Sequence, residues 1–560
     1  MIRSRWILAA AFTLAGASLS AQAPSEARIQ ELIQQAAELV ANGQTAAQAD
    51  VTTRQTLPAA ADTRLGVRLT LDEAIKAALE NNLDISVQRL NPQINDILYA
   101  SVRSVYHPSL TSTVLKQSTS NPSTSTLSGS NIVGAPVVAG VTRYDGGVAQ
   151  NIPWGGGAFN ASLNNPRSTT TSANVLFNPT FNPTWSFTYT QPLLRNFLID
   201  STRQQLQVTQ INRDISDVQL RAAITNTLSN VRNAYWDYVY ATQAVEVARQ
   251  SLELATKLVG DNQTRVEIGT MAPIDVVQAQ AEAANRRQAL VAAESARRTT
   301  ELALKRLIVA GTTDPNWNAS IDPVDRPVFR PEPIDIEAAI RRALSERTDI
   351  EIAKKNMQSN DVTLRYLQDQ LRPQADLVAT YGLQGLGGSQ LITTGQGVNR
   401  VTVGSIPGGY KDALTTLFNG NYPRWTVAMN FSYPLGLSAQ EASAARARVQ
   451  LRQVQAQIKQ IELQVATEVT NAALTAGSNA EAVQAAQAAR ELAQRKLEAE
   501  QSKFEVGMST NYFFVQAQRD LADARNAELR ATLNYRKSLV ELERLQQTTL
   551  QNLNITILGR

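Results

Sequence analysis

The fold of this chain is decided by a stretch that occurs twice, as KFEVGMSTNYFFVQAQ at 503–518 and as RVEIGTMAPIDVVQAQ at 265–280. Gly507 corresponds to Gly269, and each stretch ends in VQAQ. Both interrupt long segments that otherwise have a helical pattern. Glycine can adopt a positive φ at the end of a helix, and Pro273 suits the first turn of the next one. The two stretches therefore predict the tips of two helical hairpins.

The segments before the tips predict unusually long helices. Residues 201–268 and 438–506 contain no proline and a single glycine apiece. At ~1.5 Å per residue, each helix would span about 100 Å, and return helices of about half that length would follow at 274–309 and 512–547. One coiled-coil seam of residues seven apart is formed by Val245, Leu252, Val259 and Val266. A plain coiled coil has the same pattern, so the helices alone leave both architectures open.

Two further segments alternate strictly between apolar and small polar residues. The apolar positions are Trp185, Phe187 and Tyr189 in the first segment and Trp425, Val427, Met429, Phe431 and Tyr433 in the second. A period of two places these side chains on one face of a β-strand. A soluble β-sandwich could carry the same pattern. The aromatic residues at the ends of both segments, together with the secretory signal peptide described below, favour strands that face lipid.

The chain consists of two similar halves. Amphipathic helices are predicted at 69–85 and 333–350, from apolar residues spaced three and four apart. Strand candidates follow in each half, at 109–117, 184–192, 373–384 and 424–433. Segments 118–183 and 385–423 are rich in Ser, Thr, Asn and Gly and are predicted to be surface loops, the first long enough for extra strands around 149–164. Four strands are too few to close a transmembrane barrel, so several chains would have to share one.

Composition narrows the class of protein. Residues 1–23 have the basic start, short apolar core and small-residue end of a secretory signal peptide. Its removal would leave 51 of the 53 basic residues against 49 acidic ones, so nothing indicates a nucleic-acid partner. The chain has no cysteine, and His107 is its single histidine. We therefore expect no catalytic residues, no metal site and no cofactor.

The order of these elements resembles the TolC family of outer-membrane efflux channels. The resemblance covers 69–548 and is carried by the repeat, by TQPLLRNF and SYPLGLS after the strands, and by the paired tips. It implies a mixed α and β membrane protein: a homotrimer whose shared twelve-stranded β-barrel continues into a periplasmic α-helical coiled-coil barrel. It also implies a location in the outer membrane of a Gram-negative-type bacterium, and tips that dock onto a periplasmic adaptor linked to an inner-membrane pump.

The resemblance also suggests roles for particular residues. It implies that adaptor contacts are made by Ile268, Gly269, Thr270, Val506, Gly507 and Met508. Asp275 and Phe513 are the candidates for the pore constriction, and the eight alternating apolar residues of the strands are the candidates for the lipid-facing surface. Asp275 is equally compatible with simple stabilisation of a helix N-terminus, and both glycines with a purely conformational role. The second tip has Ser509, Phe513 and Gln516 where TolC-like channels have an arginine and then aspartates, so their salt-bridge latch is not expected here.

The resulting domain prediction has five parts. They are a signal peptide at 1–23, an extension at 24–65, a first repeat at 66–330, a second repeat at 331–548 and a tail at 549–560. The predicted function is an export conduit in a tripartite efflux or secretion system. The alternative is a structural or adhesive surface protein with a coiled-coil stalk. An exported enzyme finds no support, because no catalytic constellation is present.

Overall fold

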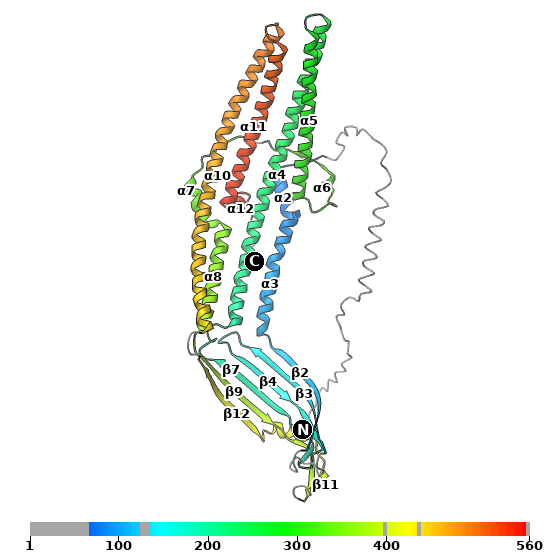
Figure 1. Cartoon of the computed structure of the whole chain (residues 1–560), viewed down its shortest axis with the longest axis vertical. Coiled ribbons are helices and arrows are strands. Elements are labelled where there is room, and N and C mark those ends of the chain that lie inside the picture. Colours follow the sequence, from blue (N-terminus) through cyan, green and yellow to red (C-terminus); the bar gives the residue numbers. More distant parts are fainter. Residues whose placement is uncertain (1–65, 124–134, 327, 396–399, 434–437, 556–560) are drawn as a thin grey trace, which may run out of the picture. The chain divides into compact units, whose positions relative to one another are not determined.

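The computed structural model describes residues 66–123, 135–326, 328–395, 400–433 and 438–555 (Figure 1). The predicted signal peptide, the extension at 24–65 and the last five residues of the tail lie outside the described residues. Within the described ranges, no helix is both long enough and apolar enough to cross a membrane.

Two helices of 67 residues each dominate the structure, α4 (Ser201–Glu267) and α10 (Ala439–Glu505). Asp200 and Ser438 cap their N-termini by accepting hydrogen bonds from backbone N–H groups of the first turn. α5 (Pro273–Ile308) and α11 (Asn511–Leu545) run back beside them (Figure 1). The two predicted hairpins are confirmed, with ends within two residues of the predicted ones.

The predictions of single helices at 69–85 and 333–350 are wrong in the same respect, because each region contains two helices. α2 (Leu71–Asn81) is followed by α3 (Leu83–Arg103), and α7 (Ile336–Glu346) by α8 (Thr348–Asp369). Asn82 explains the first break. Its Oδ1 accepts the N–H of Ile85 at 3.1 Å and its Nδ2 donates to the carbonyl of Leu307 at 2.9 Å, so it caps α3 and fixes the corner to α5.

All four predicted strands are present and antiparallel neighbours extend them into one sheet. They are β2 (Ser109–Asn121), β7 (Thr184–Pro192), β9 (Gln374–Gln384) and β12 (Pro423–Ser432). β7 pairs with β9 and β9 with β12. β2 is four residues longer than predicted.

The two segments predicted to be loops contain further strands of the same sheet. These are β3 (Val137–Asn151), β4 (Ala158–Asn164), β5 (Pro166–Thr170), β6 (Phe177–Phe181), β10 (Gly387–Thr394) and β11 (Val401–Ile406). β2 pairs with β3 along the whole length of β2, β3 pairs with β4 near the helices, and β4 pairs with β7. Near the helices, the strands thus follow the order β2-β3-β4-β7-β9-β12 (Figure 1). Six strands therefore lie side by side there, the four predicted strands together with β3 and β4, which include the region around 149–164 where extra strands were predicted.

The helices form a wall that is four helices wide at both levels. Near the sheet, the packing order is α3, α4, α8, α10; toward the tips it is α5, α4, α11, α10. One apolar core cluster joins Val231, Tyr235 and Leu304, while its counterpart in the second repeat joins Val465, Val469 and Leu542. The short elements that complete the described chain are β1 (Gly66–Leu69), η1 (Ser104–Tyr106), α6 (Pro315–Asn318), β8 (Ser320–Pro323), α9 (Tyr410–Phe418) and α12 (Thr549–Asn552).

Candidate functional site at the hairpin tips

Both tips have the same backbone conformation. Gly269 and Gly507 each have φ of +78°. In the first tip, Gly269 N–H donates to the carbonyl of Val266 at 2.9 Å and Thr270 N–H to that of Arg265 at 2.9 Å. In the second, the same two bonds run from Gly507 to Phe504 and from Met508 to Lys503. This is the Schellman motif, which satisfies the last carbonyls of a helix and requires a left-handed residue.

The predicted adaptor-contact residues lie at the extreme ends of the hairpins. The side chains of Ile268, Val506 and Met508 are 69 %, 70 % and 79 % exposed. A Cβ on either glycine would meet nothing within 4 Å, so only the positive φ demands glycine. Each tip therefore presents apolar side chains on a fixed backbone, a surface suited to binding another protein.

The two tips of one chain are held together by polar contacts that the sequence analysis did not identify. Asn262 of α4 donates to the side-chain oxygen of Asn511 at 3.1 Å, and both residues are buried. Asn511 Nδ2 in turn donates to the backbone carbonyl of Asp275 at 3.3 Å. A slip between these helices would break both hydrogen bonds and leave the two buried side-chain amide groups unpaired, so the contacts favour one register.

Aromatic side chains pack beside this amide pair. Phe504 and Phe514 are stacked with ring centroids 5.2 Å apart, and the Arg265 guanidinium lies 4.5 Å from the Phe504 centroid. Because the Phe514 ring packs against Phe504 of the same chain, it is not available to narrow a pore. Phe513 is 57 % exposed and contacts Tyr512 edge to face.

Farther along the hairpins, Glu282 of α5 joins the two repeats. Its side chain is 4 % exposed and forms ion pairs with Arg286, at 2.7 Å, and with Arg519 of α11. Burial alone would raise the pKa of the Glu282 carboxyl, but the hydrogen bonds and charges of Arg519 and Arg286 outweigh burial and lower the pKa below 4.5. Glu282 is therefore an ionised, buried link between α5 and α11.

Asp275 lies in the first turn of α5, two residues after Pro273, and is half-buried. A carboxylate at this position is stabilised by the dipole of the helix. Its backbone carbonyl is the group that binds Asn511, so the same residue connects the start of α5 to the start of α11.

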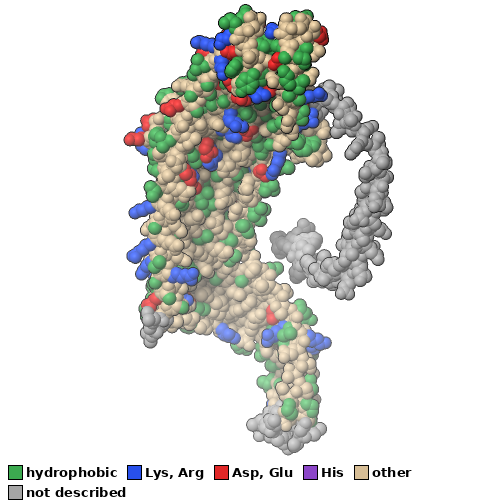
Figure 2. Space-filling model, turned by 45° about the horizontal axis from the view of Figure 1, so that its top comes forward, with side chains coloured by type: hydrophobic (Ala, Val, Ile, Leu, Met, Phe, Trp, Pro, Cys, Tyr) green, Lys and Arg blue, Asp and Glu red, His purple; other side chains and the backbone are tan. Residues whose placement is uncertain are grey.

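The sheet has one apolar and one polar face. Trp425 is opposite Tyr381, which is opposite Phe187, so the predicted apolar residues of β7 and β12 share a face. The side chains of the five apolar residues predicted in the second strand are all exposed, from 52 % for Tyr433, just after β12, to 75 % for Trp425. On the other face, Thr188 and Thr380 are hydrogen-bonded at 3.1 Å. Figure 2 shows fewer charged side chains over the sheet than over the helices.

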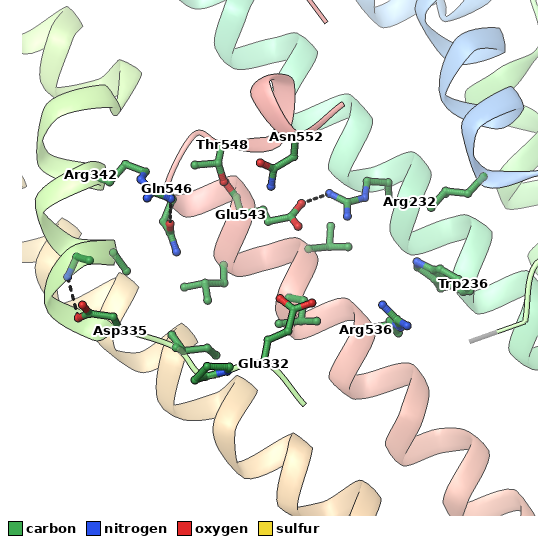
Figure 3. Close-up of a pocket in the computed structure, with 18 residues that line it drawn as sticks. Arg232, Trp236, Glu332, Asp335, Arg342, Arg536, Glu543, Gln546, Thr548 and Asn552 are labelled. Carbon is green, nitrogen blue, oxygen red and sulfur yellow. Dashed lines mark hydrogen bonds and ion pairs between the residues drawn. The ribbon is translucent and has the colours of Figure 1, made fainter. Parts of the chain in front are cut away.

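A pocket of about 440 Å³ lies where α4, α7, α11 and α12 meet (Figure 3). Arg232 of α4 forms an ion pair with Glu543 of α11 in its lining, and Arg342 of α7 donates a hydrogen bond to the neutral side chain of Gln546 at 3.4 Å. Asp335 is occupied in capping α7. The polar lining thus joins helices of both repeats at this level.

The asparagine pair and Glu282 were missed because their partners lie more than two hundred residues away in the sequence. Only the Glu282–Arg286 spacing of four, typical of a helical ion pair, gives a local signal. The burial of Glu282 could not be predicted from that spacing.

Comparisons with known proteins agree with this two-repeat architecture. The sequence matches the family model described as "Outer membrane efflux protein" at residues 158–309 and 339–546. No curated protein sequence matches the chain.

Three solved structures illustrate the similarity of fold. The Campylobacter jejuni CmeC outer membrane channel is 14 % identical, with 88 % of this chain and 90 % of that chain aligned and a TM-score of 0.58. The outer membrane protein VceC of Vibrio cholerae is 14 % identical over 85 % and 95 % of the chains, with a TM-score of 0.58. The open state of the Neisseria gonorrhoeae MtrE outer membrane channel is 17 % identical over 85 % and 88 %, with a TM-score of 0.57.

Proposed function

Because the chain belongs to the outer membrane efflux protein family, we propose that three copies form a continuous conduit from the periplasm through the outer membrane. The protein is an outer-membrane efflux channel and not an enzyme. The proposal adds the homotrimer, an N-terminal signal peptide at 1–23 that directs export, and two partners: a periplasmic adaptor and an inner-membrane pump.

The observation that supports the conduit is the combination of a two-faced sheet with two tips of the same backbone conformation. The apolar face of β7 and β12 suits lipid and the Ser- and Thr-lined face suits a water-filled lumen. The tips stand at the far ends of helices about 100 Å long, the distance given by 67 residues at ~1.5 Å each. Their exposed Ile268, Val506 and Met508 provide the surface for the adaptor.

Transport then requires tips that alternate between a closed and an open arrangement. An adaptor that binds the open arrangement more tightly shifts the population toward it. We assign the constriction of the closed arrangement to Asp275 and Phe513, each present three times around the pore axis. Three carboxylates near a narrow axis attract cations and repel anions.

Single-channel conductance of the purified protein in planar bilayers tests this proposal, with wild type compared with Asp275→Asn. We expect a small, cation-selective conductance whose selectivity is lost in the variant. Selectivity that is unchanged in Asp275→Asn would remove Asp275 from the constriction and leave it as a helix-stabilising residue.

The second candidate function is a structural or adhesive surface protein, which the long helices by themselves also suit. Oligomers that insert correctly but conduct no current would favour it and contradict the conduit.

A further inference from the structure

The apolar face of the sheet ends at a row of residues that includes two cations. Directly paired residues form rows across the strands, and the side chains of one row share a face. One row is apolar across all the strands that lie side by side near the helices: Leu110, Val148, Ala161, Phe187, Tyr381 and Trp425. Farther from the helices, Lys116, Thr142 and Arg167 form another row, called the basic row here. Both β2 and β3 are uninterrupted between the two rows, and an even number of residues separates them, so the two rows share a face.

The residues around the basic row change in character with distance from the helices. On the side toward the helices, its neighbours are Val114 and Tyr144, a directly paired residue whose ring is 59 % exposed. On the far side, the same face carries Ser118, Gly140 and Thr169. Apolar side chains followed by an exposed tyrosine and then by polar residues are typical of a lipid-facing strand that leaves the hydrocarbon layer. The basic row therefore lies at the level of the lipid headgroups, at the end of the sheet that points away from the periplasmic tips.

The two cations of the basic row have no anionic partner on their own face. Lys116 and Arg167 are both exposed, and neither forms an ion pair within the described ranges. The acidic residues in the strands of this sheet are Asp145 and Asp376, and both lie on the opposite, polar face. Two cations that share a face repel each other, and an anion bound between them would relieve that repulsion.

The spacing of the basic row suits a small anion. Lys116 and Arg167 flank Thr142 on neighbouring strands, so their Cα atoms are about 10 Å apart at ~4.8 Å per strand. Both side chains are long and flexible, and their charged ends can meet above the Thr142 hydroxyl. A phosphate group has acceptor oxygens for an ammonium, a hydroxyl and a guanidinium at once, and arginine can bind two of these oxygens in parallel.

Helix α9 supports the row at its other end. The Tyr410 hydroxyl donates to Asn165 Oδ1 at 2.8 Å, and Asn165 Nδ2 donates to the carbonyl of Tyr144 at 3.0 Å. The Tyr410 ring also contacts Phe181 edge to face, with centroids 5.9 Å apart, and Phe181 is the strand partner of Arg167. The basic row is thus part of a paired sheet whose position is fixed by tertiary contacts.

From this arrangement we propose that Lys116, Thr142 and Arg167 bind the phosphate group of an outer-leaflet lipid. The acyl chains of that lipid then lie along the apolar rows nearer the helices, and Tyr144 packs at the boundary between chains and headgroup. This proposal rests on the proposed lipid-facing role of the apolar face. It goes beyond the conduit, because it assigns the channel a particular class of lipid partner.

Titration of the purified protein in neutral detergent with bis-phosphorylated lipid A, a phosphorylated glycolipid, tests the proposal. We expect Lys116→Gln/Arg167→Gln to weaken binding about 10- to 100-fold, because two charge-assisted contacts are lost. Arg143→Gln/Arg424→Gln is the matched control. It removes the same charge from the same sheet, but both arginines lie on the polar face, so its affinity should equal that of wild type. Circular dichroism of the three proteins verifies that each is folded.

Two further titrations identify the group that is bound. Lipid A without its phosphates should bind wild type as weakly as intact lipid A binds Lys116→Gln/Arg167→Gln. Inorganic phosphate at millimolar concentration should leave most of the lipid A bound, because the apolar rows contribute to lipid binding and not to binding of the free ion. Complete displacement by inorganic phosphate would mean a site for the free ion and contradict a lipid site.

Three other results would overturn the proposal. They are equal affinity of wild type and Lys116→Gln/Arg167→Gln, an equal loss in the control variant, and equal binding of the dephosphorylated lipid. None of them bears on the conduit, which is tested by conductance. If Phe187→Arg shows that the apolar face meets lipid and lipid A still binds all three proteins equally, then the phosphate site alone is wrong.

Discussion

The glycines at the tips are required by their backbone conformation and not by lack of space. In Gly507→Ala the new Cβ has room, but a left-handed φ costs an L-residue about 1–2 kcal/mol. We expect amide hydrogen exchange at Met508, whose N–H closes the Schellman motif, to accelerate roughly 5- to 30-fold. Gly477→Ala, inside α10 with free space around its Cβ, is the control and should leave the tip unchanged. Unaltered exchange at Met508 in Gly507→Ala would contradict this account.

Glu282 makes the contact between α5 and α11 dependent on pH. Its pKa in the folded protein lies below 4.5, so its contribution to stability is present above pH 4.5 and is lost as the pH falls through the folded value. Glu282→Gln removes a charged acceptor from two arginines and should cost about 1.5–3 kcal/mol at neutral pH.

Thermal unfolding followed against pH measures this effect. Wild type should lose stability on acidification more steeply than Glu282→Gln, which no longer has the carboxyl to protonate. Glu337→Gln is the control, since Glu337 and its partner Arg341 are 85 % and 70 % exposed and contribute little. Parallel pH profiles of wild type and Glu282→Gln would exclude Glu282 as the titrating group.

Strand β7 offers a matched comparison of its two faces. Phe187→Arg would place a charge on the apolar face at a cost of about 2–4 kcal/mol if that face meets lipid, whereas Thr188→Arg would point into the lumen. We expect Phe187→Arg to reduce the yield of folded protein in membranes severalfold and Thr188→Arg to retain it. Equal yields would show that the face of Phe187 does not meet lipid.

Along α3, exposed apolar residues spaced four and three apart form a stripe, which leads to a prediction about association: Leu83, Val87, Leu90, Ile94 and Ile97. Leu90→Ala/Ile97→Ala removes apolar surface that the next copy would bury, and each buried truncation costs about 2–5 kcal/mol. The proposed trimer of this variant should therefore dissociate in detergent at a lower temperature than that of wild type. Leu474→Ala, which truncates an exposed leucine of α10 and leaves the α3 stripe intact, is the control. The same dissociation temperature for all three proteins would mean that the α3 stripe is not an interface.

The elements differ in how well the sequence predicts them, for physical reasons. β7 and β12 were predictable because large apolar residues alternate along them. β3 (VVAGVTRYDGGVAQN) was not, because small residues and three glycines hide its alternation. α3 was missed beyond residue 85 because Pro92, inside the helix, argues against helix in sequence. The tip glycines were predictable from local chemistry, whereas the amide pair of Asn262 and Asn511 depends on tertiary packing.

For the assembled channel, the exposed aromatic ring at each second tip provides a test of closure. We expect Phe513→Ala to raise single-channel conductance, because three truncated rings widen the proposed constriction. Phe418→Ala, which removes a ring that is 74 % exposed in α9, is the control. Conductance of Phe513→Ala no larger than that of wild type would argue against aromatic closure.

The equal length of α4 and α10 restricts how this protein can change during evolution. Each inserted residue would advance the tip beyond it by ~1.5 Å and turn it by about 100° around the helix axis. An insertion in one repeat alone would therefore separate Asn262 from Asn511 and turn one of the two tips away from the direction in which it is proposed to dock. Insertions and deletions in the long helices should persist only when they are matched in both repeats, whereas the connections between strands are free to vary in length.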